Sequence, residues 1–127
     1  MTDDDRAARG MRIRREVLGD EHVDRAAAAA TEFTAPFQDL ITRYAWGEIW
    51  SRPGLSRAER SIITLTALAT LRQEEELALH VGAAVRNGLT EAQIQEVLLQ
   101  VAVYAGVPAA NRAFAIAQRV LAELAVS

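Results

Sequence analysis

The chain has 127 residues, a formal net charge of −3 and no cysteine, and half of its residues are hydrophobic. This length suits one domain, residues 1–127, with enough apolar side chains to bury a core without metal or disulfide crosslinks. The lack of cysteine excludes disulfides, thiolate metal sites, cysteine nucleophiles and dithiol redox chemistry. The negative charge argues against a nucleic-acid partner, because such proteins normally present a basic face to phosphates.

The N-terminal segment predicts a helix from Asp4 to Leu18 that stops at Gly19. Its arginines make it the one basic stretch, and we expect them to form a solvated or subunit-contacting face. The arginines of this face are Arg6, Arg9, Arg12, Arg14 and Arg15.

The first residues do not resemble a signal peptide. Asp3-Asp4-Asp5 stands where a signal peptide would place basic residues before an apolar stretch. We therefore expect no signal peptide, no membrane partner and a cytoplasmic location.

Two weaker helix signals follow. The segment Asp24–Thr31 contains the alanine run Ala26–Ala30, which favours helix by propensity but offers little side chain for packing. Thr34 is the predicted N-cap of the next helix, with Pro36 in its first turn. This helix is expected to run toward Glu48 and to end at the following Pro-Gly turn.

The second half of the chain carries two capping-box signatures, Ser56–Glu59 and Thr90–Gln93. The first opens a predicted buried central helix that ends near Leu71. Apolar residues recur at three- and four-residue steps and strand-like alternation is absent, so the predicted fold is an all-α bundle of about six to seven helices. The remaining predicted helices are Glu74–Asn87, Ile94–Ala105 and a last one opened by Pro108.

His80 is the first candidate for chemistry, because it is one of two histidines and lies in a helical apolar stripe. It shares a helix face with Leu77, Val81 and Ala84. It is either a proton donor or acceptor near neutral pH or a hydrogen-bonded core histidine. Glu76 lies one turn before His80, but two ligands do not make a metal site, and no metal is predicted.

Glu48 is the second candidate. It lies two residues from both Trp46 and Trp50, and we expect the indoles to wall it off from water, which would suit a catalytic acid or an orienting partner for His80. The alternative is a solvated carboxylate at a helix end. Arg52 and Arg60 have the guanidinium geometry that matches carboxylates, although each is equally consistent with a surface charge.

These residues lie in stretches that strongly resemble the 4-carboxymuconolactone decarboxylase family, above all Gly47–Leu55 and Tyr104–Asn111. The resemblance implies the all-helical fold shared with AhpD-type alkylhydroperoxidases and assembly as a homo-oligomer, either a hexamer built as a trimer of dimers or a trimer. Those relatives carry Cys-x-x-Cys shortly before the histidine equivalent to His80. Gln73 and Glu76 occupy the cysteine positions here, so peroxidase chemistry is excluded. Further matching stretches are Val17–Gly19, His22–Val23, Arg60, Arg86–Gly88 and Glu96–Val101.

The resemblance implies decarboxylation of 4-carboxymuconolactone to 3-oxoadipate enol-lactone, in the protocatechuate branch of the β-ketoadipate pathway of aromatic degradation. The leaving carboxylate sits on a carbon that is linked to the lactone carbonyl through a conjugated double bond, so the substrate is its own electron sink and no cofactor is required. The protein then has to bind two carboxylates, stabilise an oxyanion and deliver one proton to carbon.

On this hypothesis His80 donates the proton and Glu48 orients or relays, although the two roles can be exchanged. Two alternatives stay open: another lactone or β-keto acid undergoing decarboxylation or isomerisation in the same pocket, and an oligomeric protein that binds a carboxylate without turnover. In the remaining assignments Arg52 and Arg60 bind carboxylates or the oxyanion, Trp50 desolvates the leaving carboxylate, and Tyr104 and Asn111 add hydrogen bonds. The alternative for Tyr104, beside a Gly-Val-Pro break, is packing at a helix or subunit junction.

Overall fold

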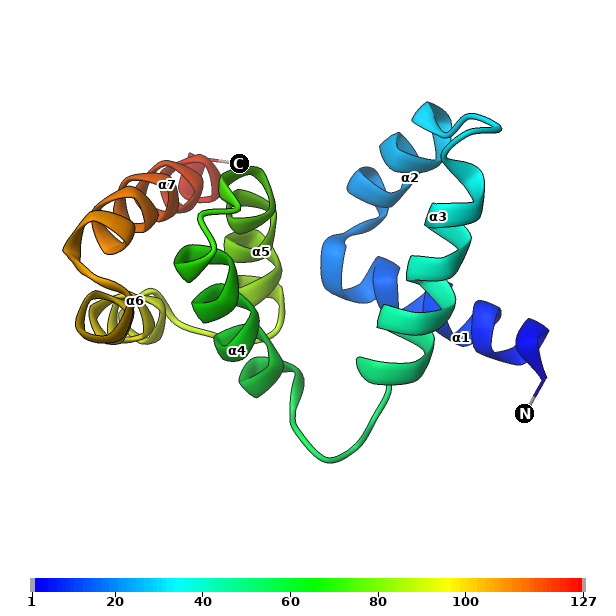
Figure 1. Cartoon of the computed structure of the whole chain (residues 1–127), viewed down its shortest axis with the longest axis horizontal. Coiled ribbons are helices and arrows are strands. Elements are labelled where there is room, and N and C mark those ends of the chain that lie inside the picture. The colour runs from blue at the N-terminus through cyan, green and yellow to red at the C-terminus, as the bar shows by residue number, and fades with distance from the viewer. Residues whose placement is uncertain (1, 127) are drawn as a thin grey trace. The chain divides into compact units, whose positions relative to one another are not determined.

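The computed structural model describes residues 2–126, and within this range the chain forms helices and no strands, which confirms the all-α prediction (Figure 1). It divides into two compact units, the first ending at Leu55 and the second beginning at Ser56. The first unit contains α1 (Asp3–Leu18), α2 (Asp20–Ala29), α3 (Ala35–Ile41) and the π-helix η1 (Thr42–Ile49). The second contains α4 (Arg57–Thr70), α5 (Glu74–Arg86), α6 (Glu91–Ala105) and α7 (Val107–Val126).

In the first unit, α1 packs against η1, which continues directly from α3 as one helical column (Figure 1). Two glycines allow the backbones to approach closely. A Cβ atom on Gly10 would collide with the Thr42 carbonyl oxygen, and one on Gly47 would lie 2.5 Å from the Arg6 carbonyl oxygen. Any larger residue at either position would push the two helices apart. The apolar side chains buried in this unit are Ile13, Val17, Leu18, Val23 and Trp46.

The predicted solvated or subunit-contacting arginine face of α1 is wrong for three of its members, Arg6, Arg9 and Arg14, which contact η1 or α3 within the first unit. Arg14 is only 7% exposed and donates hydrogen bonds to Thr42 (3.2 Å) and Gln38 (2.9 Å). Arg9 is half-buried and donates to the Gly47 carbonyl oxygen. Guanidinium groups at these positions therefore fasten α1 to the column that follows, because their several N–H groups can satisfy backbone and side-chain oxygens together.

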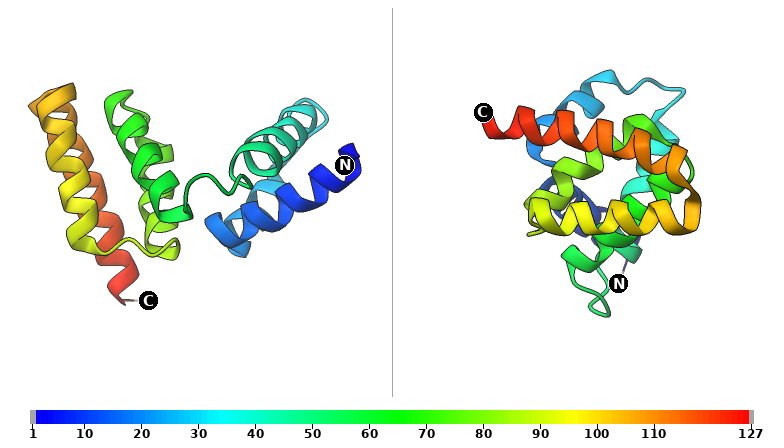
Figure 2. Two further views of the ribbon diagram at one scale, coloured as in Figure 1. Left: turned by 90° about the horizontal axis from the view of Figure 1, so that it is seen from below. Right: turned by 90° about the vertical axis from the view of Figure 1, so that its left-hand side faces the viewer.

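The second unit has an apolar core made by all four of its helices, with α6 and α7 lying side by side (Figure 2). Both predicted capping boxes are present, at Ser56–Glu59 and Thr90–Gln93. The predicted buried central helix, α4, buries one face only, since Ile62 is 37% exposed and Ile63 is 55% exposed. Its buried residues Ser61, Leu65 and Ala69 recur every four residues and so share one face.

Most helix boundaries agree with the sequence. Gly19 ends α1 with a φ of 90°, as its predicted role as a helix stop requires. The second helix begins at Asp20 rather than at the predicted Asp24. Thr34 does occupy the N-cap of α3, but its hydroxyl pairs with Thr31 instead of capping the helix. In the described part of the chain, no helix is both long and apolar enough to cross a membrane.

Candidate active site

Glu48 lies near the end of η1, where the helix widens. The N–H of Trp50 bonds to the carbonyl oxygen of Ala45, five residues back, at 2.9 Å. Such π-type turns are uncommon and often occur at functional sites. The widened turn holds the rings of Trp46 and Trp50 with centroids 5.0 Å apart and planes tilted by 32°.

Of the two alternatives for Glu48, the indole walls are not found, and a side chain that is 46% exposed near the end of η1 agrees with the solvated carboxylate at a helix end. Trp46 and Trp50 face each other, and residues two apart on a helix do not share a face. A carboxylate midway between two stacked indoles therefore points away from both. Glu48 is close to both tryptophans in sequence, but closeness in sequence does not determine which face of the helix a side chain occupies.

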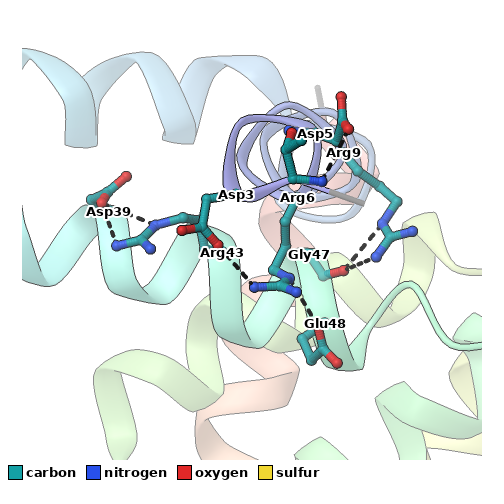
Figure 3. Close-up of polar contacts among 9 residues, drawn as sticks. Asp3, Asp5, Arg6, Arg9, Asp39, Arg43, Gly47 and Glu48 are labelled. Atoms are coloured by element: carbon teal, nitrogen blue, oxygen red, sulfur yellow. Dashed lines mark hydrogen bonds and ion pairs between the residues drawn. The ribbon is translucent and has the colours of Figure 1, made fainter.

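Helix α1 supplies the partners of this segment (Figure 3). The Nε of Arg6 lies 3.0 Å from Oε2 of Glu48, and its Nη1 lies 3.2 Å from Asp3. Arg9 donates from Nε (3.1 Å) and Nη2 (2.7 Å) to the carbonyl oxygen of Gly47, the residue before Glu48. Both the carboxylate and the backbone that carries it are thus held from α1.

Glu48 also borders an open groove of about 320 Å³ in the first unit. Tyr44 and Leu40 contribute a polar and an apolar wall to it, and both are more than half exposed. Arg6 and Arg43 complete the lining. Because Arg43 pairs with Asp39 at 2.6 Å, the two guanidinium groups beside the groove each have a carboxylate partner (Figure 3).

Trp50 and Arg52 follow Glu48 at the end of the first unit. Trp50 is half-buried against Trp46, while Arg52 is exposed in the turn, where its N–H bonds to the carbonyl oxygen of Ile49 at 3.1 Å. The hydroxyl of Ser51 donates to the Gly47 carbonyl oxygen at 2.7 Å. Glu48, Trp50 and Arg52 therefore lie on one short, well-bonded segment, with the arginine at its solvent side.

His80 lies on α5 in the second unit and is 8% exposed. Its helix neighbours Leu77, Val81 and Ala84 are buried at 2%, 0% and 0%, whereas Glu76 in the first turn is exposed. The predicted apolar stripe around His80 is therefore confirmed. These surroundings suit either a core histidine or a proton donor shielded from bulk water.

Arg60, Tyr104 and Asn111 also belong to the second unit, and the structure places them on three different helices. Arg60 is half-buried on α4, and Asn111 is exposed on α7. Tyr104 is 83% exposed and borders a groove of about 650 Å³ lined by α4 and α6. In the single chain the Tyr104 side chain is therefore open to solvent and is not enclosed in a pocket.

The seven candidate residues thus fall into two groups, three in the first unit and four in the second. Only the first group, on residues 48–52, is a contiguous segment. The partnership of Glu48 with His80 stays a prediction. Within residues 2–126, no group of three acidic, histidine or cysteine side chains is placed to hold a metal ion.

Arg6 and Arg9 are the residues that the sequence interpretation missed. Their signal was their spacing with Gly10 and Ile13, at steps of three and four residues on one helix face. A glycine and an isoleucine on the face shared with two arginines indicate that this face packs against another element. Charge alone does not reveal this packing.

Comparison with known proteins adds independent findings. The sequence model of the Carboxymuconolactone decarboxylase family matches residues 35–119, which begin in the first unit and end in the second. A 4-carboxymuconolactone decarboxylase from Acinetobacter baylyi is 42% identical over 127 residues, covering 100% of this chain and 95% of the relative. A nitrosuccinic acid decarboxylase from Metarhizium robertsii is 43% identical over 115 residues, covering 91% of this chain and 80% of the relative.

Proposed function

Because the chain belongs to the carboxymuconolactone decarboxylase family, we propose that it decarboxylates 4-carboxymuconolactone to 3-oxoadipate enol-lactone. The observation that carries this proposal is the 42% identity along all of this chain to a relative named for that activity. The reaction would place the protein in the protocatechuate branch of the β-ketoadipate pathway. The domain of residues 1–127 stays part of the proposal, supported by a family match that spans both units.

The proposed reaction needs no external electron acceptor. The bond between the ring carbon and the leaving carboxylate breaks, its electron pair moves through the ring double bond, and the lactone carbonyl oxygen takes the negative charge. Carbon dioxide departs, and the resulting dienolate accepts one proton at the carbon beside the carbonyl. The protein lowers the barrier by desolvating the leaving carboxylate, stabilising the oxyanion and supplying that proton.

We assign these tasks to the candidate residues by their chemistry. His80, shielded on α5, and Glu48, fixed at the end of η1, are the proposed proton-handling groups. Arg52 and Arg60 are the proposed partners of the substrate carboxylates or of the oxyanion, because guanidinium groups bind carboxylates with two parallel hydrogen bonds. The indole of Trp50 is the proposed apolar wall, and Tyr104 and Asn111 are proposed to add hydrogen bonds.

A second substrate is favoured by a specific observation, the 43% identity to the nitrosuccinic acid decarboxylase. Nitrosuccinic acid also carries two carboxyl groups, and its nitro group can take the electron pair that a departing carboxylate leaves behind. Both substrates thus belong to one class, small dicarboxylic acids with a built-in electron sink. 4-Carboxymuconolactone remains the first choice, because the match to the 4-carboxymuconolactone decarboxylase covers more of this chain and more of the relative than the match to the nitrosuccinic acid decarboxylase does.

We also propose that the protein is a homo-oligomer, a hexamer built as a trimer of dimers or a trimer, and that it works in the cytoplasm. Large apolar side chains stand open to solvent in the single chain, including Phe33 (92%), Val103 (75%) and Val107 (71%). Exposed apolar surface of this kind is typical of interaction sites. Native mass spectrometry would measure the number of subunits, and cell fractionation would test the location.

Carbon dioxide release from each substrate by the purified protein tests the proposed function. We expect rapid turnover of 4-carboxymuconolactone and formation of the enol-lactone by NMR, with slower turnover of nitrosuccinic acid. The variants His80→Ala and Glu48→Ala should abolish turnover and leave helicity and assembly intact. Release from nitrosuccinic acid alone would move the activity to that substrate, and ligand-dependent thermal stabilisation without product would support a binding protein.

A further inference from the structure

We propose that Arg6 is a positioning residue for catalysis, which acts by holding the carboxylate of Glu48 in one orientation. This inference rests on the proposed function, because it concerns the same carboxylate. The contact that carries it is the 3.0 Å pair between Arg6 Nε and Glu48 Oε2. It joins residues 42 positions apart in sequence, so the fold and not the local helix brings them together.

The pair engages one oxygen of Glu48 and points the other away from α1 (Figure 3). A glutamate that is 46% exposed would otherwise sample several rotamers. The Arg6 Nε makes no hydrogen bond, so the contact acts through charge and proximity, which favour the rotamers that keep the carboxylate beside the guanidinium. Holding a proton-handling group in one geometry is a recognised way to raise turnover, since misplacement by a fraction of an ångström slows proton transfer.

The backbone under Glu48 is fixed from the same helix. The carbonyl oxygen of Gly47 accepts hydrogen bonds from both Arg9 nitrogens and from Ser51. A Cβ atom on Gly47 would also lie 2.9 Å from Cγ of Arg6, so the arginine stem lies against the backbone that it serves. Carboxylate and backbone are therefore both held by α1, which the sequence presents only as a basic helix.

A purely structural role for Arg6 predicts a different outcome. The side chains of Arg6 and Glu48 are 34% and 46% exposed, and ion pairs at such exposure contribute little to stability. Loss of the pair should therefore change the unfolding temperature slightly. A large change in turnover with a small change in stability would show that Arg6 positions Glu48 and does not mainly stabilise the fold.

The chain offers a matched control in Arg15. Its side chain is 35% exposed, it lies on the same helix as Arg6 but outside the groove that Glu48 borders, and it also pairs with carboxylates, those of Asp20 and Asp24. The variants Arg6→Gln and Arg15→Gln therefore remove the same charge from the same helix at similar burial. Only the first removes a partner of Glu48.

The test measures kcat, KM and unfolding temperature for Arg6→Gln, Arg6→Lys, Arg15→Gln, Glu48→Gln and the double variant Arg6→Gln/Glu48→Gln. We expect kcat to fall about tenfold in Arg6→Gln with an unchanged KM, and about threefold in Arg6→Lys, which keeps a cation without the planar geometry. Arg15→Gln should retain the original kcat. The double variant should be no slower than Glu48→Gln alone, which we expect to lose about a hundredfold.

The outcomes are distinguishable. A wild-type protein without turnover contradicts the proposed function, and a Glu48→Gln variant with normal turnover contradicts the role of Glu48. If Glu48→Gln is slow while Arg6→Gln keeps the wild-type kcat, the positioning role of Arg6 is wrong. Effects that multiply in the double variant also overturn it, because Arg6 would then act independently of Glu48. Should Arg6→Gln fail to fold, an unchanged kcat in Arg6→Lys would equally contradict the positioning role.

Discussion

In the second unit the buried side chains form one apolar cluster, in which Leu65, Val81 and Ala84 are shielded completely from solvent. In the first unit α1 and η1 meet through two closely approaching glycine backbones, through the Arg9 hydrogen bonds to the Gly47 carbonyl oxygen and through the ion pair between Arg6 and Glu48. Apolar burial has no preferred direction, whereas a guanidinium hydrogen bond does. The second unit therefore supplies a shielded place for His80, and the first holds the backbone before Glu48 and places Arg6 beside its carboxylate.

The largest expected effect comes from truncating a side chain in the apolar core of the second unit. Leu65→Ala removes a side chain that is 0% exposed at the centre of the second unit, and we expect it to lower the free energy of unfolding by about 3 kcal/mol. Hydrogen exchange should rise most in α4 to α7. The control is Leu99→Ala, which truncates a leucine that is 49% exposed. Equal losses in the two variants would contradict the proposed core.

The next effect breaks the backbone contact of the first unit. Gly10→Ala places a Cβ atom against the Thr42 carbonyl oxygen, and we expect a loss of about 2 kcal/mol, with faster exchange in α1 and η1. Alanine favours helix more than glycine does, so any destabilisation must come from the collision. Gly54→Ala is the matched control, because no atom lies within 4 Å of a Cβ there. A Gly10→Ala variant as stable as the wild type would mean that the helices do not approach this closely.

The smallest effect concerns acid sensitivity at the helix ends. Hydrogen bonds from the backbone and side chain of Ser56 lower the pKa of Glu59 below its ordinary value of 4.5, and those of Thr2 lower the pKa of Asp5 below 3.8. The folded state thus binds these protons less readily than the unfolded state. The contribution to stability is complete above the ordinary values and is lost as the pH falls through the lowered ones.

One capping box provides an internal control, because Thr90 pairs with Gln93, which does not titrate. Glu59→Gln should keep the Ser56 box and reduce the loss of stability measured by acid titration below pH 4.5. Gln93→Glu should increase that loss. Parallel acid titration curves for the wild type and both variants would show that the caps do not contribute.

The sequence predicted the helices well because their ends carry local chemistry. Ser56–Glu59, Thr90–Gln93 and Gly19 each act through bonds or dihedral angles within a few residues, so their effect can be derived without the fold. The burial of His80 followed from helical periodicity in the same way. Periodicity and caps are local, and most predictions that depended on them were confirmed. The exceptions are the side-chain cap at Thr34, which is absent, and α4, which buries one face only.

The partners of the site could not be derived in this way. Arg6 meets Glu48 across 42 positions, and Arg9 meets Gly47 across 38, so both contacts depend on how α1 packs. The exposure of Glu48 depends on the face it occupies in a π-helix, which the expected ordinary helix did not include. Charge and neighbours along the chain gave no information on either point.

The most direct test of the account is decarboxylation of 4-carboxymuconolactone by the pure protein in D₂O, with the product taken early in the reaction and analysed by deuterium NMR in a chiral aligned medium. Such a medium is needed because the two singly deuterated products are mirror images. Proton delivery by a fixed side chain predicts one deuteron per product molecule, in only one of the two positions on the ring carbon beside the carbonyl. Equal labelling of both positions would show that the dienolate is released and protonated in solution. That result, or no release of carbon dioxide, would contradict the proposed mechanism.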